Sequence, residues 1–280
     1  MKKLLALVLV GAMTFSMVGC GSSNTTTAEA TTEVATEAAG TTEAATEAAA
    51  TEAASDKVYL IATDTTFAPF EFEDESGNMI GIDLDLLQAI SEDQGFQYEL
   101  QVLGFSAAVT ALEAGQCDGV IAGMSITDER KEKYDFSDPY YDSGVGMAVA
   151  SDSDIVSYED LDGKSVAAKV GTQGCDFAES IADQYGFTVT QFEDSSSMYQ
   201  DVLSGNSVAC FEDYPVMGYE ISKGMALKMP MPMDESTISS YGFATLKGSS
   251  PELVEMFNAG LADLKESGKY DEIVSTYVAK

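Results

Sequence analysis

The chain has 280 residues with 47 acidic side chains, 14 basic side chains and no histidine, so its formal net charge is −33. This charge works against binding to nucleic acid or to anionic lipid, because both need a cationic surface on the protein. The absence of histidine removes the usual general base, the commonest metal ligand and the histidine-dependent catalytic triads.

The first residues have the pattern of an export signal. Lys2 and Lys3 precede an apolar run that ends at Gly19-Cys20. This order is typical of a cleaved signal, and the run is too short for a stable membrane span. The ending Met17-Val18-Gly19-Cys20 resembles a bacterial lipobox, which implies that residues 1–19 are removed and that Cys20 carries lipid. An ordinary secretory signal with an incidental Cys20 is the alternative.

Residues 21–55 consist almost entirely of Ser, Thr, Ala, Glu and Gly, and Val34 is their only large apolar side chain. Such a segment cannot bury enough apolar surface to fold. As a flexible coil it has a root-mean-square reach on the order of 30–35 Å. We therefore expect residues 20–55 to form a lipidated, disordered tether that holds the protein on the extracytoplasmic face of the cell membrane.

From residue 56 onward, short apolar strands alternate with amphipathic helices. The first series predicts strands at 58–62, 98–103 and 119–122, with helices at 83–93 and 106–114. After residues 144–150, the second series predicts strands at 165–170, 188–192 and 208–211, with helices at 176–185, 198–203 and 216–223. A strand at 241–246 and helices at 251–266 and 270–278 close the chain. This alternation predicts largely parallel sheets in two α/β lobes, separated by a break near residues 140–145.

Three cysteines remain after Cys20, namely Cys117, Cys175 and Cys210. Their spacing fits no zinc motif, and we expect them to be buried as small apolar residues. A disulfide between Cys175 and Cys210 stays open as an alternative.

Two acidic clusters resemble metal-binding sites, but their positions are typical of helix caps and of a hairpin turn. Asp83 and Asp85 flank a helix start, where carboxylates are typical caps. Residues 74–78 lack the twelve-residue calcium pattern and are typical of a hairpin turn. The sequence therefore predicts no metal site.

Arg130 is the only arginine in the chain, although residues 56–280 contain eleven lysines. A guanidinium binds a carboxylate through two parallel hydrogen bonds, which a lysine ammonium cannot do. The alternative is a solvated side chain on a short helix capped by Thr127. The residues alone leave both interpretations open.

Several motifs follow one another in order over residues 56–280. They are Thr63-Asp64-Thr65-Thr66-Phe67-Ala68-Pro69-Phe70-Glu71-Phe72, Gly81-Ile82-Asp83-Leu84-Asp85, Gly104-Phe105-Ser106, Gly123-Met124-Ser125-Ile126-Thr127-Asp128-Glu129-Arg130, Lys169-Val170-Gly171-Thr172 and Phe211-Glu212-Asp213. This set closely resembles the motifs of the polar amino-acid-binding proteins of ABC importers, which are bacterial extracellular solute-binding proteins of family 3. Within the family, the first string and the lysine before Gly171 look most like the glutamine-binding members.

The resemblance implies an α/β fold of the periplasmic-binding-protein-like type II, with two α/β lobes joined by a two-strand hinge. Lobe 1 would comprise residues 56–140 and 242–280, and lobe 2 residues 145–238. The ligand would lie in the interlobe cleft, where open α/β sheets bind ligands. The resemblance implies a monomer with no cofactor.

The resemblance also assigns roles at the amino-acid head group. Arg130 would bind the ligand's α-carboxylate, assisted by backbone amides at Ser125 and around Gln173. The carbonyl of Gly123, the hydroxyl of Ser125 and the carboxylate of Asp213 would receive its α-ammonium.

The ligand's side chain would lie between Phe67 and Phe105, and Asp64 and Lys169 would contact its polar end. A carboxamide satisfies both an acceptor and a donor, so glutamine is the expected ligand. Glu212 stands where the glutamine-binding pattern has histidine, which is a departure from that pattern. Phe70 and Phe72 are expected in the core.

The predicted function is therefore delivery of a polar amino acid to the permease subunits of an ABC transporter, with no catalysis. The alternative is a secreted enzyme of the same fold that resembles cyclohexadienyl or arogenate dehydratases. In that case Glu212 or Asp64 would serve as an acid with a raised pKa. The missing histidine weakens the alternative.

Overall fold

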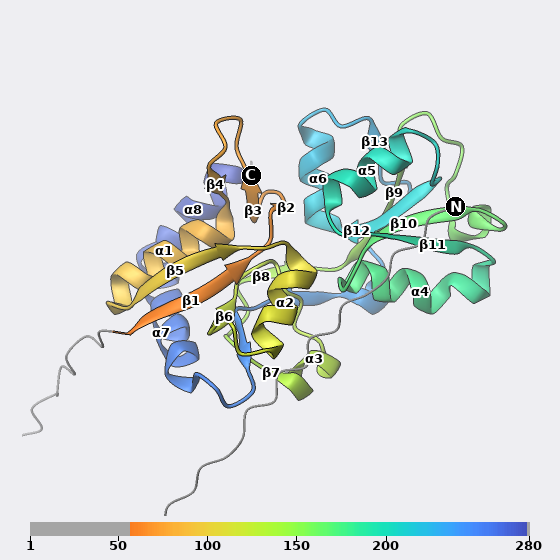
Figure 1. Ribbon diagram of the computed structural model, residues 1–280. Helices are drawn as coiled ribbons and strands as arrows, with labels where there is room; N and C mark the ends of the chain where they lie inside the picture. Colours follow the sequence, from red (N-terminus) through yellow and green to blue (C-terminus); the bar gives the residue numbers. More distant parts are fainter. Residues whose placement is uncertain (1–56, 279–280) are drawn as a thin grey trace, which may run out of the picture. The chain divides into compact units, whose positions relative to one another are not determined.

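The computed structural model describes residues 57–278 (Figure 1), so the predicted signal peptide, the predicted lipidation site Cys20 and the predicted tether lie outside the described residues. No helix within residues 57–278 is long and apolar enough to span a membrane. The described chain is built around two five-stranded sheets, and we call each sheet with its helices a lobe.

Lobe 1 contains the sheet β5-β1-β6-β15-β7. Its strands are β1 (Val58–Thr63), β5 (Gln97–Val102), β6 (Gly119–Val120), β7 (Tyr134–Phe136) and β15 (Ala244–Leu246). Its helices are α1 (Ile82–Gln94), α2 (Phe105–Glu113), α3 (Asp128–Lys133), α7 (Pro251–Ser267) and α8 (Lys269–Tyr277). Most of these were expected from the sequence, and β7 was not.

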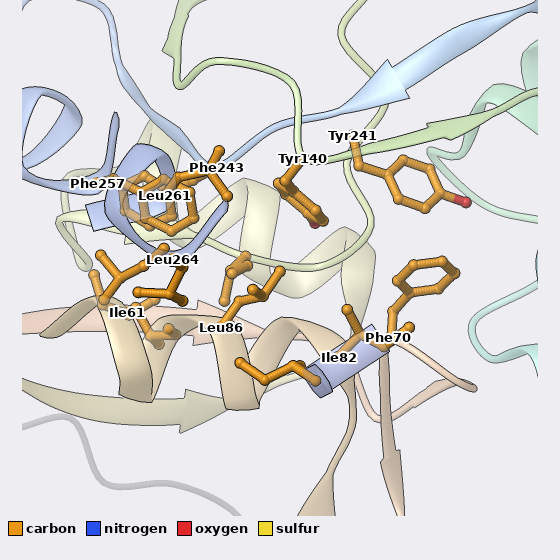
Figure 2. Packing of buried hydrophobic residues seen from close by; sticks show 14 of the residues in the cluster. Ile61, Phe70, Ile82, Leu86, Tyr140, Tyr241, Phe243, Phe257, Leu261 and Leu264 are labelled. Atoms are coloured by element: carbon orange, nitrogen blue, oxygen red, sulfur yellow. The ribbon is translucent and has the colours of Figure 1, made fainter. Parts of the chain in front are cut away.

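Successive side chains of β1 enter two different cores, because a strand points alternate residues to opposite faces. Tyr59 and Ile61 pack with α1 and α7, whereas Ala62 packs with α2. On the α7 side, the rings of Phe243 and Phe257 lie against each other (Figure 2). They are stacked, and their centroids are 4.7 Å apart. The sheet of lobe 1 is therefore covered on both faces, as predicted.

Lobe 2 contains the sheet β11-β10-β12-β9-β13. Its strands are β9 (Val145–Ala150), β10 (Ser165–Lys169), β11 (Thr188–Phe192), β12 (Ala209–Asp213) and β13 (Leu227–Lys228). Its helices are α4 (Gln173–Tyr185), α5 (Ser195–Leu203) and α6 (Tyr214–Ser222), with 3-10 turns η1 (Tyr158–Leu161) and η2 (Glu235–Thr237). One face packs on α4 and the other on α5 and α6.

The expectation of largely parallel sheets is only half right. β1 is parallel to β5 and β6, and β10 is parallel to β11 and β12. However, β15 is antiparallel to β6 and β7, and β9 is antiparallel to β12 and β13. The reason is topological: β9 and β15 arrive from the other lobe, so each enters its sheet without the helical crossover that parallel neighbours need.

Two paired segments carry the chain between the lobes. β8 (Tyr141–Ser143) and β14 (Ser239–Tyr241) run antiparallel to each other. The strand predicted at residues 241–246 is therefore wrong as one element, because β14 belongs to this connection and β15 to the lobe 1 sheet. Gly242 lies at the break, where a Cβ atom would lie 2.8 Å from Ile126.

A small sheet formed by β2 (Thr66–Phe67), β3 (Glu71–Glu73) and β4 (Met79–Ile80) lies in lobe 1. Oδ1 of Asp74 accepts hydrogen bonds from the amides of Ser76 and Asn78, at 2.8 and 2.9 Å. The hairpin turn predicted at residues 74–78 is confirmed.

All three described cysteines are buried free thiols, so the Cys175–Cys210 disulfide is not formed. Burial raises the pKa of the Cys117 and Cys175 thiols to about 11. They behave as the small apolar residues that the sequence predicted.

The interpretation of Asp83 as a helix cap is wrong. Gly81 is the N-cap of α1, and Asp83 is fully buried. Oδ2 of Asp83 accepts hydrogen bonds from the amide of Gly123 (2.8 Å) and from the hydroxyl of Tyr140 (2.7 Å). Asp85 does not cap α1 either, since its carboxylate accepts from Tyr277. Asp83 instead holds the loop after β6 in place.

Glu71 lies next to this carboxylate with no solvent exposure. Among the described residues, neither oxygen of Glu71 has a hydrogen-bond donor, and Oδ1 of Asp83 also has none. Burial, followed by the charges of Asp83 and Asp64, raises the pKa of Glu71 well above its usual value. A proton on Glu71 would supply the missing donor between these carboxyl groups.

Replacing Glu71 with glutamine should remove a pH dependence of stability. Because the folded state holds the Glu71 proton more tightly than the unfolded state, wild-type stability falls as pH rises above the ordinary glutamate pKa. The slope is up to about 1.4 kcal/mol per pH unit. Urea unfolding of both proteins between pH 5 and 8 should show a free-energy difference that grows in favour of Glu71→Gln. A constant difference would contradict a protonated Glu71.

Candidate ligand-binding site

A narrow, nearly filled cavity lies between the two lobes. Its lining includes every one of the nine predicted site residues and two further ones, Ala122 and Thr172. The complete lining is Asp64, Phe67, Phe105, Ala122, Gly123, Ser125, Arg130, Lys169, Thr172, Gln173 and Asp213.

The cavity lies where strands end and helices begin. Asp64 follows β1, Lys169 ends β10 and Asp213 ends β12. Phe105 and Gln173 are the first residues of α2 and α4. Carboxyl ends of parallel strands and amino ends of helices are the places where open α/β sheets bind ligands.

The side chain of Arg130 is half-buried and lines the cavity. Its Nη1 donates to the carbonyl of Ser125 (3.0 Å), and its Nη2 donates to the carbonyl of Gly171 (2.9 Å). The guanidinium carbon lies 5.6 Å from the centroid of the Phe105 ring. Burial lowers the pKa of Arg130, and the charges of nearby carboxylates oppose that shift. The arginine fork is thus held in one orientation by carbonyls of both lobes.

The amino terminus of α4 adds backbone donors beside this fork. Thr172 is its N-cap, and the Thr172 hydroxyl accepts from the amide of Cys175 (3.2 Å) and donates to the carbonyl of Lys169 (2.7 Å). The free amides of a first helical turn favour an anion. Sequence reasoning missed Thr172 because it placed the start of this helix at residue 176, whereas α4 begins at Gln173.

The side chain of Gln173 is used within the protein. Its Nε2 donates to the carbonyl of Thr237 (2.9 Å), and its Oε1 accepts from the hydroxyl of Ser239 (2.9 Å). This leaves the backbone amide of Gln173 for a ligand, which is the group that the family resemblance assigned.

Asp213 is almost fully buried on the lobe 2 side of the cavity. Burial raises its pKa to about 6, while a hydrogen bond from Tyr241 and the charge of Arg130 lower it. The Tyr241 hydroxyl donates to Oδ2 of Asp213 at 2.5 Å. Tyr241 comes from the connection β14, so an aromatic residue of the hinge fixes the carboxylate. Sequence reasoning did not identify this contact.

Gly123 and Phe67 form one wall of the cavity. Gly123 has a φ of +52°, and a Cβ atom there would collide with the Phe67 ring. Phe70 is fully buried with its ring 4.9 Å from Tyr241, so its predicted place in the core is confirmed. Phe72 is half-buried between Tyr219 and Tyr277, so the prediction of a core position is wrong for it.

Asp64 and Lys169 form an ion pair at the far end of the cavity, with 1% and 0% of their side chains exposed. Oδ1 of Asp64 also accepts from the amides of Thr65 (2.7 Å) and Phe105 (3.1 Å). Nζ of Lys169 lies 5.3 Å from the centroid of the Phe67 ring. The opposite charges of Asp64 and Lys169 therefore leave this end of the site with no net charge.

Glu212 lies behind Lys169 and is fully buried. Its Oε2 accepts from the Ser195 hydroxyl at 2.8 Å, and the same hydroxyl lies 3.3 Å from Nζ of Lys169. Its Oε1 accepts from the amide of Asp213 at 3.1 Å. The position where the sequence departs from the glutamine-binding pattern is thus joined to the site through Ser195.

The chain belongs to the bacterial extracellular solute-binding proteins, family 3. The family match covers residues 59–280. The arginine-binding extracellular protein ArtP of Bacillus subtilis (strain 168) is 28% identical over 98% of this chain and 96% of its own length. The chain is an amino-acid-binding protein of an ABC transporter and not an enzyme, and the dehydratase alternative is not favoured.

Two solved structures differ in how well they superpose. Substrate-binding domain 2 of Lactococcus lactis GlnP, in an open conformation, is 44% identical, covers 81% of this chain and 98% of its own, and has a TM-score of 0.56. An ancestral arginine-binding protein bound to glutamine is 34% identical over 80% of this chain and 98% of its own, with a TM-score of 0.72. The less similar sequence has the more similar structure.

Proposed function

We propose that this protein binds glutamine in the interlobe cavity and delivers it to the permease of an ABC importer. The observation that carries the proposal is the order of charges along the cavity. An arginine fork and a helix amino terminus lie near one buried carboxylate, and a cancelled ion pair lies at the far end. This order matches an amino acid with a neutral, polar side chain.

The head group of an amino acid needs one anion site and one cation site a few ångströms apart. Arg130 and the amides at Ser125 and Gln173 receive the α-carboxylate. Asp213, the carbonyl of Gly123 and the hydroxyl of Ser125 receive the α-ammonium. Charge-assisted hydrogen bonds of this kind contribute about 1.5–3 kcal/mol each.

At the far end, a carboxamide donates to Asp64 and accepts from Lys169. A glutamate side chain would set a carboxylate against Asp64, and an arginine side chain would set a guanidinium against Lys169. Two of the similar proteins support glutamine and arginine as the ligands to compare. ArtP is named as an arginine-binding protein, and the ancestral arginine-binding protein is bound to glutamine.

Replacing Arg130 with lysine should weaken glutamine binding by at least about 2 kcal/mol, roughly thirtyfold, because a point charge replaces a two-pronged donor. Isothermal titration calorimetry measures this loss. Lys131→Ala is the matched control, because Lys131 lies on the same helix but is exposed and pairs with Asp128 at 3.2 Å. If Arg130→Lys stays within threefold of the wild type, Arg130 does not hold the ligand.

A thermal-shift panel of the twenty amino acids and cystine tests the ligand. Glutamine should raise the melting temperature by several degrees, because a ligand that binds only the folded state stabilises it. Arginine, cystine and glutamate should give smaller shifts at neutral pH. No shift with glutamine and a large shift with another amino acid would refute the assignment.

Ligand binding should close the cavity, because the proposed ligand contacts come from both lobes. The two lobes also bond to each other directly beside the cavity. Arg130 donates to the carbonyl of Gly171, the amide of Ser195 donates to Thr66 (3.1 Å), and Ser106 donates to Glu193 (2.9 Å). The low TM-score against the open GlnP domain supports a hinge between the lobes. We place the hinge near Ser143-Gly144 and Ser240-Tyr241-Gly242.

A dye pair on Ser76→Cys and Gln200→Cys should report a shorter separation when glutamine is added, because these exposed positions lie on different lobes. The buried native thiols with raised pKa values should stay unlabelled. A wild-type protein treated with the dyes is the control. A separation that stays constant at saturating glutamine would exclude closure.

We also propose that Cys20 is acylated and that residues 20–55 tether the protein to the outer face of the membrane. Several acyl chains on one residue, at about 0.8 kcal/mol per buried methylene, would make the attachment stable. Cys20→Ser should move the protein from the membrane fraction to the soluble fraction. A variant that stays in the membrane fraction would show that attachment does not depend on this cysteine.

A further inference from the structure

We propose that Glu212 selects the charge of the ligand's side chain: protonated Glu212 favours glutamine, and ionised Glu212 favours a ligand with a cationic side chain such as a guanidinium. This inference rests on the proposed function, because it concerns the same cavity. Glu212 does not line the cavity and acts through Ser195 and Lys169, so it is a positioning residue.

The geometry gives Lys169 two carboxylate partners. It pairs directly with Asp64, and it reaches Glu212 through the Ser195 hydroxyl, at 3.3 Å from Nζ and 2.8 Å from Oε2. All three side chains are buried, with 1%, 0% and 0% exposed for Asp64, Lys169 and Glu212. A charge left over among them has no water to screen it, and an unpaired buried charge is strongly unfavourable.

The charges in the occupied cavity determine which ligand fits the protonated and which fits the ionised form of Glu212. Arg130 pairs with the α-carboxylate, Asp213 pairs with the α-ammonium, and Lys169 pairs with Asp64. Every charge then has one partner if Glu212 carries a proton and the ligand's side chain is neutral. If Glu212 is ionised, one negative charge remains, and only a cationic side chain balances it.

An ionised Glu212 also changes the partner of Lys169. With Glu212 negative, the Lys169 ammonium is attracted toward Ser195 and Glu212, and Asp64 is left to bind a guanidinium. With Glu212 neutral, Lys169 stays on Asp64 and repels a cation. The preferred ligand therefore depends on whether Glu212 carries its proton.

The surroundings of Glu212 place this proton near neutral pH. Burial raises the pKa of Glu212 to about 7, Lys169 lowers it and Asp213 raises it again. An α-ammonium bound to Asp213 would keep Asp213 ionised, so a proton taken up by these two carboxyl groups would bind to Glu212. The titratable and charged groups that face Glu212 are Lys169 on β10, Cys210 and Asp213 on β12, Tyr199 on α5 and Tyr241 on β14.

The sign of the pH dependence follows for each ligand. Glutamine binding requires a protonated Glu212, so its Kd should rise up to tenfold per pH unit above the pKa of Glu212 in the free protein. Binding of arginine requires the ionised form, so its Kd should rise as pH falls below that pKa. The ratio of the two affinities therefore changes in one direction across the neutral range.

Calorimetric titration of the full chain with glutamine and with arginine, at pH 5.5 to 8.5, tests the inference. Each titration is run in two buffers of different ionisation enthalpy. The difference between the two measured binding enthalpies gives the number of protons taken up. At pH 8 the wild type should take up close to one proton with glutamine and none with arginine. Glu212→Gln should bind glutamine at pH 8 as tightly as the wild type does at pH 6, and should lose at least tenfold in arginine affinity at pH 8.

Glu159→Gln, an exposed substitution on η1 of the same lobe, is the control and should keep the wild-type pH profile. Glutamine binding with no proton uptake and a constant Kd across the range would overturn the role of Glu212 and leave the proposed function standing. A failure of the wild type to bind either amino acid would instead overturn the proposed function. The proton count uses the wild type alone, so the test holds even if Glu212→Gln does not fold.

Discussion

The ion pair between Asp64 and Lys169 is the buried charge–charge contact that joins the two lobes at the cavity. Each residue lies at the end of a strand in a different lobe, and together they have almost no exposed surface. Such a pair is stable only while both partners stay together, since either charge buried alone would cost several kcal/mol. In the proposed hinge motion, water would replace each partner when the lobes separate. The contact joins the two lobes and does not belong to the fold of either one.

The acidic character of the chain extends into its interior. Glu71, Asp83, Glu212 and Asp213 are all buried, and burial raises the pKa of each. Basic residues are few, and Lys169 is the one lysine among the fully or nearly fully buried residues that the structure describes. The buried carboxyl groups therefore take hydrogen bonds from hydroxyl groups where less acidic proteins would use cations. These hydroxyl groups belong to Tyr140, Tyr241 and Ser195. The binding properties of such a protein should depend on pH near neutrality.

The hinge and the cavity share residues. Tyr241 lies in β14, packs its ring against Phe70 in the lobe 1 core, and donates its hydroxyl to Asp213 in lobe 2. Gln173 begins α4 at the cavity and bonds with its side chain to Thr237 and Ser239 beside the same connection. A ligand that contacts Asp213 and the α4 amino terminus is thus one hydrogen bond away from the segments that join the lobes. In the proposed function, this arrangement would link occupancy of the cavity to the position of the hinge.

The sequence by itself determined the fold class and the order of most elements, and it identified nine of the eleven residues that line the cavity. The elements follow from local apolar periodicity. The nine residues follow from the resemblance of local motifs to a known family, such as the string around Asp64 and the segment that ends at Arg130. The tertiary structure decided the rest. Asp83 became a buried anchor for Gly123 instead of a cap, the predicted strand at 241–246 divided between hinge and sheet, and Glu212 came within reach of Lys169 through Ser195. In each case the deciding partner is at least 17 residues away in the chain, and no local pattern encodes a contact that exists only after the sheets have packed.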